Sequence, residues 1–481
     1  MVALATTRVL AGAKLASAEG LSHGLVLDGL HKPRGLVEDS LGSLLVVERG
    51  KGILRLVLDG TGVGVASKGM VVNEGTLNHG IDLSADGRTL FASSSTDVYA
   101  WDYDANDGKA WNRRHLIAGM KQGGHETRTL LVPRHDANLL LVSRGSDGNV
   151  DMGTVKASSG RSQIRVFRID DLLRRGPVGF EAGDVLGWGL RNSVGVAEDP
   201  TTGNIWSVEN SLDNMHRQGQ DIHQTNPGDE LNFHGRPSND NNKRQKGHSS
   251  SRSSRGDDDD DDDDYGRNFG YPGCVAIWDP STVKNLVGVG PAAVTGQQIT
   301  GDQVKGWNFT DEWCRSETVA PMLTLDAHLA PLDIDFHPDG SEAYVSMHGS
   351  WNRNPGVGYR LSRFAFGHDG FPLHNRSSRT AEKPMLWDVG GHCPGFLGGK
   401  NCFRPVGVAF ASASPASASA SASASASASA SASASASASS SGGGGVPQQQ
   451  RLFVTSDDTG ELFVVTGEMG GAASRARVRY R

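Results

Sequence analysis

The segment from His348 to Pro355 gathers several chemically active side chains in a short space. Its sequence, His-Gly-Ser-Trp-Asn-Arg-Asn-Pro, places an imidazole, an indole, an amide and a guanidinium within six residues, directly after the strand-like run 342–347. Such a set can stack on a flat ring, pair with carboxylates and move a proton. These abilities are useful together only if the fold brings further groups of the same kind to this strand end.

Arginines with a similar placement recur through the chain. At least five stand at or beside the ends of strand-like runs, and they would repel one another if they converged on one channel. Aspartates could neutralise part of this charge. A bound polyanion would do so more specifically, because a guanidinium pairs with a carboxylate through two parallel hydrogen bonds. The arginines are Arg49, Arg144, Arg191, Arg267, Arg353 and Arg404.

Other residues suggest acid–base chemistry and cation binding. His79, His328 and His348 are candidate general bases, because the ordinary imidazole pKa of about 6.5 suits proton transfer near neutral pH. The loop Ser211-Leu212-Asp213 combines backbone carbonyls with a carboxylate, which suits a hard cation such as calcium. Each of these residues also has a purely structural interpretation, such as an ion pair or a turn contact between strands.

The elements that would position these residues repeat along the chain. An apolar strand, an Asp/Gly turn, a second apolar strand and a polar end recur six times, and the early copies start about every 45 residues, the period of a four-stranded propeller blade. The sequence therefore predicts an all-β fold, a six-bladed β-propeller whose polar strand ends meet at a central channel. A pair of β-sandwiches is the alternative. The copies begin near Gly35, Gly80, Arg128, Val194, Leu332 and Val406.

Two low-complexity segments interrupt the pattern. Residues 238–264 are polar and end in eight consecutive aspartates, and residues 411–450 are dominated by alternating Ala and Ser. Both lack the apolar residues of a core, so we expect disordered loop insertions in one domain at 20–467, with flexible ends at 1–19 and 468–481. Outside the aspartate run, the chain has 46 acidic and 47 basic residues. This balance indicates no nucleic-acid surface, and no apolar run is long enough to predict a membrane helix.

The four cysteines, Cys274, Cys314, Cys393 and Cys402, all lie in the second half of the chain. Their even number, and the short Pro/Gly-rich loop that the last two enclose, favour disulfides and an oxidising compartment. Four free thiols in a cytosolic protein are the alternative. We expect a secreted, extracellular monomer, although residues 2–18 match a signal peptide only weakly.

Seven short motifs follow one another in the order found in a known family. In sequence and order they resemble the pyrroloquinoline-quinone (PQQ)-dependent sugar dehydrogenases, especially the fungal pyranose dehydrogenase and L-sorbosone-dehydrogenase-like branch. The resemblance covers nearly the whole chain outside the two insertions. The motifs are Gly-Leu-Arg-Asn-Ser-Val-Gly-Val (189–196), Glu-Asn-Ser-Leu-Asp-Asn (209–214), Gly-Asp-Glu-Leu-Asn (228–232), Asn-Phe-Gly-Tyr-Pro-Gly-Cys (268–274), Ala-His-Leu-Ala-Pro-Leu-Asp (327–333), His-Gly-Ser-Trp-Asn-Arg (348–353) and Phe-Arg-Pro-Val-Gly (403–407).

The resemblance implies a six-bladed propeller with PQQ in its channel and a calcium ion at the edge of the quinone ring. Calcium would polarise the quinone carbonyl. The family oxidises a sugar hydroxyl, in a pyranose, aldose or 2-ketoaldose, by hydride transfer to the quinone. We expect no cytochrome module after Arg481, so that the electrons would pass to an external acceptor such as a cytochrome.

The resemblance also assigns roles to single residues. His79 would be the general base, with His328 and His348 as competing candidates. The backbone carbonyls of the loop at Ser211, Leu212 and Asp213 would hold calcium. The cofactor would be bound by Arg49, Arg191, Asn192, His348, Trp351, Arg353 and Arg404.

Two other functions stay open from the sequence. One is a secreted propeller that binds a ligand without a cofactor, which should have lost His79 or one of the arginines. The other is a calcium-dependent propeller lactonase, which needs a cage of Asp, Asn and Glu side chains and no arginine cluster. The arginines disfavour the lactonase.

Overall fold

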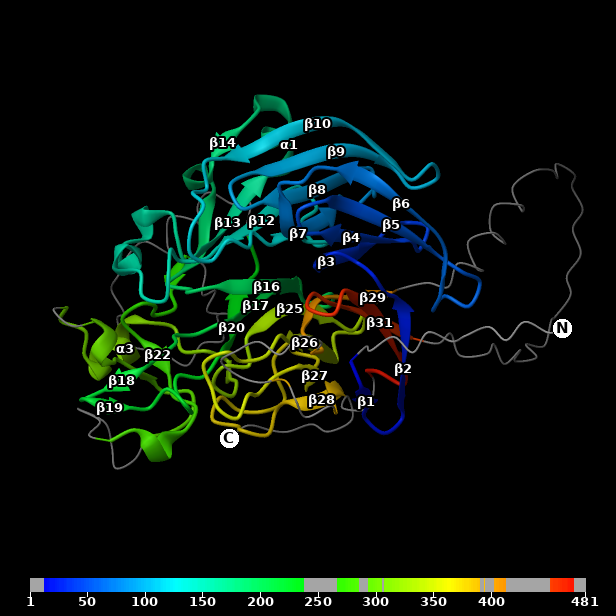
Figure 1. Ribbon diagram of the computed structural model, residues 1–481. Coiled ribbons are helices and arrows are strands. Elements are labelled where there is room, and N and C mark those ends of the chain that lie inside the picture. Colours follow the sequence, from blue (N-terminus) through cyan, green and yellow to red (C-terminus); the bar gives the residue numbers. More distant parts are fainter. Residues whose placement is uncertain are drawn as a thin grey trace, which may run out of the picture.

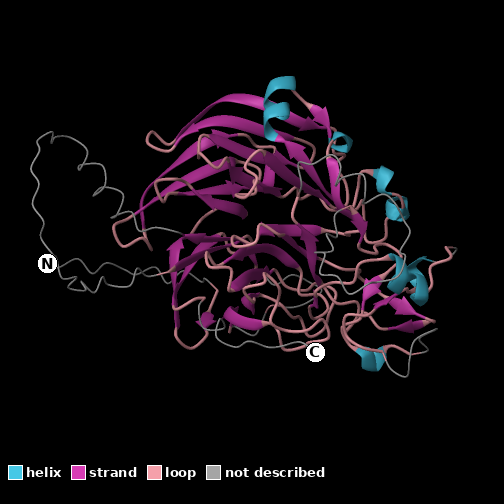
Figure 2. Cartoon of the chain, turned by 180° about the vertical axis from the view of Figure 1, so that it is seen from behind, coloured by secondary structure: helices cyan, strands magenta, loops and turns pink. Residues whose placement is uncertain are grey.

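The computed structural model describes residues 13–237, 266–284, 293–304, 307–389, 393, 402–411 and 450–470. Within these ranges the chain forms six sheets of four or five strands, and the first strand of each sheet contacts the first strand of the next. Figures 1 and 2 show these sheets gathered around one centre. The predicted all-β, six-bladed propeller is confirmed.

In each of the first three blades, the strands are arranged in sequence order from the channel outward. The first blade contains β3 (Pro33–Glu38), β4 (Leu44–Glu48), β5 (Gly52–Leu58) and β6 (Val65–Asn73). The second contains β7 (Leu77–Leu83), β8 (Thr89–Ser94), β9 (Val98–Asp104) and β10 (Lys109–Ala118), with β14 (Val178–Gly179) at its edge. The third contains β11 (Leu130–Leu131), β12 (Leu139–Arg144), β13 (Gln163–Arg168) and β15 (Asp184–Trp188), with β21 (Arg267–Asn268) at its edge.

The remaining blades complete the ring. The fourth contains β16 (Ser193–Glu198), β17 (Ile205–Glu209), β20 (Glu230–Gly235) and β24 (Leu323–Thr324). The fifth contains β25 (Pro331–Phe336), β26 (Glu342–Met347), β27 (Arg360–Ala365) and β28 (Lys383–Asp388), with β1 (Leu15–Ser17) at its edge. The sixth contains β29 (Pro405–Ala411), β30 (Arg451–Ser456), β31 (Glu461–Gly467) and β2 (Leu21–Leu27).

The N-terminal strands close the ring, which the sequence did not predict. Strand β2 pairs with β31 and so supplies the outer strand of the last blade, while β1 pairs with β28 of the fifth. The expectation of a flexible end at 1–19 is therefore wrong for 15–17. The reason is apolar burial, since Leu15 and Leu21 pack against the core between the fifth and sixth blades.

A smaller lobe is inserted between β20 and β24. It contains β22 (Val275–Ala276), β23 (Gln298–Ile299) and α3 (Asp311–Glu317), and it lies beside the hairpin β18 (His216–Arg217) and β19 (Gln220–Asp221), at one side of the molecule in Figure 1. The disulfide Cys274–Cys314 ties this lobe together, and a second disulfide joins Cys393 to Cys402. The predicted disulfides are confirmed. Helix α1 (Ile169–Arg175) follows β13.

The predicted insertions at 238–264 and 411–450 lie, apart from Ala411 and Gln450, outside the described residues. In the part of the chain that is described, no helix is long and apolar enough to cross a membrane.

The apolar core lies between the blades. Six clusters of buried side chains each join two neighbouring blades. Strand β4 illustrates the cause: Leu44 and Val46 pack towards the sixth blade, whereas Leu45 and Val47 pack towards the second. Because successive side chains point to opposite faces and both faces are covered, such strands read as continuous apolar runs.

The inner strands approach one another so closely that glycine is required at the contacts. A methyl group at Gly80 would overlap the carbonyl oxygen of Arg128, which begins the inner segment of the next blade. No side chain other than hydrogen fits there. The same relation holds between Gly35 and the His79 carbonyl, between Gly195 and the Asp333 backbone, and between Gly407 and the Arg34 carbonyl.

Carboxylates bridge the inner strands further along the channel. Asp82 in β7 accepts the Val132 N–H of the third blade at 2.6 Å, and burial raises the pKa of this carboxyl to about 6. Asp333 in β25 accepts the Val408 N–H of the sixth blade at 2.8 Å. The neighbouring inner strands do not share a sheet, so these bonds satisfy backbone donors that would otherwise be buried and unpaired.

We predict that Asp82→Ala lowers the free energy of unfolding by about 1–3 kcal/mol, because the Val132 N–H loses its acceptor inside the protein. The matched control is Asp107→Ala, which removes only an exposed ion pair to Lys109 at 3.4 Å and should cost less than about 0.5 kcal/mol. Urea unfolding of both variants measures the difference. Equal losses would show that the bridge between the blades does not stabilise the ring.

Candidate active site

A connected network of charged side chains joins three blades at one end of the channel. Arg34 in β3 donates from Nη1 to Asp457 Oδ2 at 2.6 Å, and His348 Nε2 lies 2.8 Å from Asp457 Oδ1. Arg404 donates from Nη2 to His348 Nδ1 at 2.8 Å. An arginine N–H can only donate, so Nδ1 of His348 accepts and Nε2 holds the proton that is donated to Asp457. The network fixes the His348 tautomer and links the first, fifth and sixth blades.

The network has unmet hydrogen-bond donors. The buried Nε atoms of Arg34 and Arg404 have no hydrogen-bond partner among the described residues. Burial lowers the pKa of Arg34, opposed by Asp457, and the nearby Arg49 and Arg404 lower it further. Buried guanidinium donors without acceptors are costly. This end of the channel is therefore suited to an anionic ligand.

Arg34 is a site residue that the sequence analysis missed. It stands in Pro33-Arg34-Gly35, where the chain enters the first inner strand, and Arg404 stands in Arg404-Pro405-Val406-Gly407, where it enters the last. In both segments an arginine precedes a glycine that contacts a neighbouring blade. A search for arginines just ahead of the inner-strand glycines would have found it.

The predicted base, His79, is enclosed in the channel wall. His79 is only 2% exposed, and its Nδ1 atom has no hydrogen-bond partner within the described structure. Burial lowers the pKa of His79 well below its usual value, and Arg34 lowers it further. A general base must come within hydrogen-bond distance of the proton that it accepts. The geometry of His79 therefore argues against the predicted role.

Arg191 belongs to a second network, in which its guanidinium is fully engaged. Its Nη2 atom donates to Asp213 Oδ2 at 2.9 Å and to Asn149 Oδ1 at 3.0 Å, and Nη1 donates to the Asn210 carbonyl at 3.2 Å. The same amide oxygen of Asn149 accepts the Asp213 N–H at 2.9 Å. The predicted cofactor ligand Arg191 thus orders the loop that contains Asp213.

The loop at Ser211 and Leu212 presents carbonyl groups. Asp229 accepts the Ser211 N–H at 2.9 Å, while the Leu212 side chain is buried at 1% exposure in a small apolar cluster. Within the described residues, neither the Ser211 nor the Leu212 carbonyl accepts a hydrogen bond. Two unpaired carbonyls beside the Asp213 carboxylate are the kind of oxygen donors that a hard cation binds.

His328 is occupied by partners on both nitrogens. Its Nε2 atom donates to the His223 carbonyl at 2.6 Å, and Nδ1 lies 3.6 Å from Asp213 Oδ1. Burial alone would lower the pKa of His328, but Asp213 and Asp229 together raise it. An imidazole that holds its proton is a poor proton acceptor.

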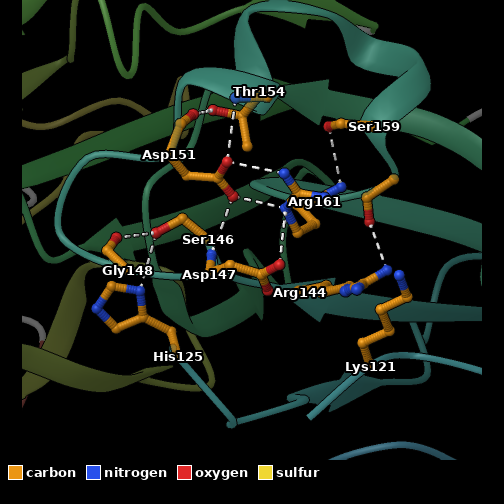
Figure 3. Close-up of polar contacts among 12 residues, drawn as sticks. Lys121, His125, Arg144, Ser146, Asp147, Gly148, Asp151, Thr154, Ser159 and Arg161 are labelled. Carbon is orange, nitrogen blue, oxygen red and sulfur yellow. Dashed lines mark hydrogen bonds and ion pairs between the residues drawn. The ribbon is translucent and has the colours of Figure 1, made fainter. Parts of the chain in front are cut away.

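His125 is a histidine that the sequence analysis overlooked. It is half-buried, and Gly145 lies between it and Asn192, since a methyl group there would contact both. Its Nδ1 atom lies 3.0 Å from Ser146 Oγ, whose hydroxyl donates to the Gly148 carbonyl at 2.7 Å (Figure 3). Because the serine proton is already used, Nδ1–H of His125 must be the donor, which leaves a lone pair on Nε2. Burial lowers the pKa of His125 to about 4, and Arg191 contributes to the shift.

A set of ionic contacts holds the loop that carries Ser146. Arg161 donates to both oxygens of Asp151, at 2.5 and 2.7 Å, and lies 3.3 Å from Asp147 Oδ2 (Figure 3). Asp151 also accepts the Asp147 N–H at 3.0 Å. This bidentate pair fixes the turn through residues 146–151 and therefore the direction of the His125 ring. The sequence signal for His125 was the motif Gly124-His125-Glu126, which lies just before the inner strand of the third blade. The similar motif Asn78-His79 lies within the inner strand of the second blade.

The remaining predicted residues differ in their exposure. Trp351 is 47% exposed, whereas Arg353 is tied to Asp326 at 2.6 Å and to the Ala327 carbonyl at 3.0 Å. Arg49 is 49% exposed in its side chain and pairs with Glu126 at 3.3 Å. Among the arginines at the strand ends, Arg191 and Arg353 have carboxylate partners, whereas the buried Nε atoms of Arg144 and Arg404 have no hydrogen-bond partner within the described structure.

The family model described as TrAA12-like matches residues 15–251 and 253–425. A PQQ-dependent sugar dehydrogenase of Hypocrea jecorina is 36% identical over 456 residues, which covers 93% of this chain and 88% of that protein. A PQQ-dependent pyranose dehydrogenase of Coprinopsis cinerea is 37% identical over 460 residues. The match covers 93% of this chain but only 54% of the Coprinopsis protein, so the chain spans about half the length of that relative.

Solved structures agree with these relatives. The calcium structure of a Trichoderma reesei enzyme of family AA12 is 36% identical, with a TM-score of 0.77 over 95% of this chain and 98% of that chain. The holo form of the PQQ domain of Coprinopsis cinerea pyranose dehydrogenase is 35% identical, also with a TM-score of 0.77, over 94% and 97% of the two chains. The chain therefore belongs to the family of PQQ-dependent sugar dehydrogenases, a family of oxidoreductases.

Proposed function

We propose that the protein oxidises a hydroxyl group of a sugar by hydride transfer to PQQ, which binds in the channel between the Arg34–Arg404 network and the Asp213 loop. The observation that supports this most directly is the gathering of three guanidinium groups, Arg34, Arg49 and Arg404, beside the Asp457 carboxylate at one end of the channel. The cofactor is flat and carries three carboxylates, which are acceptors that guanidinium groups bind. The residues present therefore fit the group.

Several residues would hold the cofactor. Arg34 and Arg404 would bind its carboxylates, and His348 would keep Arg404 in place through the 2.8 Å contact. Arg49 would add positive charge at the rim. The exposed indole of Trp351 offers an aromatic face for stacking. Arg191, Asn192 and Arg353 would border the site and order its loops.

Calcium is proposed at the carbonyls of Ser211 and Leu212, next to the Asp213 carboxylate. These oxygens are hard ligands, and Arg191 and Asp229 hold the loop from opposite sides. A cation there would lie in the same part of the site as His125, whose pKa is influenced by Arg191 and Asp213.

We propose His125, rather than His79, as the general base. Its Nδ1–H is committed to Ser146, so Nε2 can accept the hydroxyl proton of the sugar. The low pKa keeps the ring neutral near pH 7. When bound, the quinone would accept the hydride from the same carbon that carries the hydroxyl, which balances the loss of the proton. His79 would act only as a wall residue beside Arg34.

Further parts of the proposal rest on the resemblance and on composition. The acceptor of the electrons would be an external partner such as a cytochrome. Disulfides support an extracellular location. We propose that residues 20–467, together with β1, form one domain that acts as a monomer on a pyranose, aldose or 2-ketoaldose.

The first prediction concerns the cofactor. Addition of PQQ and calcium to the apoprotein should give saturable binding at micromolar concentration, measured by the change in quinone absorbance, and dye reduction with sugars. Arg404→Gln should weaken quinone binding about 10- to 100-fold, because a buried charged hydrogen bond is lost. Arg174→Gln, on the exposed side of α1, is the control and should bind normally. The absence of saturable binding by the wild-type protein would contradict the proposed function.

The second prediction separates the two histidines. His125→Gln should retain quinone binding but lower kcat about 10²- to 10⁴-fold, the usual contribution of a general base. His79→Gln should retain most of its turnover once its folding has been verified by circular dichroism. Normal turnover in His125→Gln together with loss in His79→Gln would return the base role to His79.

The third prediction is the pH profile. A base with a pKa near 4 is protonated, and therefore inactive, only below that pH. We expect kcat/KM to fall on the acid side between about pH 5 and 4, rather than around the ordinary imidazole value of about 6.5. An acid limb centred near 6.5 in stopped-flow reduction assays would contradict the assignment.

A further inference from the structure

A second cavity lies outside the channel and is lined mainly by aromatic rings. Its volume is about 290 Å³, and it is formed where the edge of the third blade meets the inserted lobe. Trp188 and Asn268 come from the paired ends of β15 and β21, and the opposite wall comes from the segment that leads into α3. Its aromatic lining consists of Trp188, Tyr271, Trp307, Phe309 and Trp313.

The rings are arranged as a continuous surface. Trp307 and Phe309 lie almost parallel, with an interplanar angle of 18° and centroids 6.1 Å apart, and Phe309 meets Trp313 edge to face at 4.9 Å. Phe309 lies directly on Gly273, where a methyl group would touch the ring. Trp307 is 47% exposed. An exposed indole beside two further rings offers a flat face to a ligand.

The wall is rigid before any ligand binds. The Cys274–Cys314 disulfide joins the loop at 270–274 to α3. Arg217 donates to both oxygens of Asp311 at 2.6 and 2.8 Å, and Thr310 caps the first turn of α3 through the Trp313 N–H. Preorganised walls reduce the entropy lost on binding.

The polar groups of the cavity are neutral. The described lining contains the amides of Asn268 and Asn308 but no Asp, Glu, Lys, Arg or His. A charged ligand would lose hydration there without gaining an opposite charge. A pyranose ring matches the cavity, since its C–H face meets the negative faces of aromatic rings and its hydroxyls can bond to amides.

The cavity also adjoins the candidate active site. The Tyr271 ring lines it, and the Tyr271 hydroxyl accepts the Asp151 N–H at 2.7 Å and donates to the Asn149 carbonyl at 3.1 Å. Asn149 in turn contacts both Arg191 and Asp213. One hydrogen-bonded residue therefore separates the two sites.

We propose that this cavity is a second saccharide site, which holds one pyranose ring of a neutral oligosaccharide against Trp307. It is separate from the channel in which a sugar would be oxidised, and it depends on the proposed function only for the choice of sugars. Its occupation needs neither the quinone nor calcium.

The test uses the full chain without cofactor, so that its failure can be told apart from a failure of the proposed dehydrogenase. Neutral trisaccharides of glucose, xylose and mannose are titrated and followed by saturation-transfer NMR and tryptophan fluorescence. We expect at least one to bind saturably, and Trp307→Ala to weaken that binding about 3- to 10-fold. Trp111→Ala, which removes a 52% exposed indole from β10 of the second blade, is the matched control and should bind as the wild type does.

Trp307→Ala should also retain the wild-type kcat on monosaccharides in the reconstituted enzyme, because the residue lies outside the channel. Failure of all three trisaccharides to bind, equal affinity in Trp307→Ala, or binding of an apolar dye alone would overturn the proposal.

Discussion

The close approach of the inner strands is the constraint on which the rest of the structure depends. Glycines at the contacts let the backbone of one inner strand touch the backbone of the next, while buried side chains join the blades further out. Two of the site residues are positioned by the same contacts. Gly35 follows Arg34 and touches the His79 carbonyl, and Gly407 touches the carbonyl of Arg34. Geometry that closes the ring thus also fixes the direction in which the site side chains leave the backbone.

The channel is electrostatically divided. The guanidinium groups of Arg34, Arg49 and Arg404 gather at one end, whereas the carboxylates of Asp82 and Asp333 line a cavity of about 670 Å³ further along. Burial raises the pKa of Asp333 to about 8, so this group holds its proton near neutral pH. The guanidinium groups attract an anion to their end of the channel.

The sequence predicted the ring well because the blade repeat has a clear physical origin. Strands buried on both faces read as apolar runs, and turns between them need Gly and Asp. The closure by β1 and β2 could not be predicted, since the N-terminal segment is separated from its partners by most of the chain. The site was predicted only in part. Residue types revealed His348, Arg404 and the Asp213 loop, but not that Arg191 and Arg353 already have carboxylate partners. Which histidine keeps a free lone pair depends on the hydroxyl of Ser146, a contact that no motif encodes.

The central claim is that the guanidinium groups of Arg34 and Arg404 bind the quinone. A crystal structure of the protein with PQQ and calcium tests it most directly. The account predicts cofactor carboxylates within about 3 Å of the Arg34 and Arg404 guanidinium groups, a cation on the Ser211 and Leu212 carbonyls, and His125 Nε2 facing the open side of the quinone. A cofactor bound elsewhere, with neither guanidinium group in contact with it, would contradict the account.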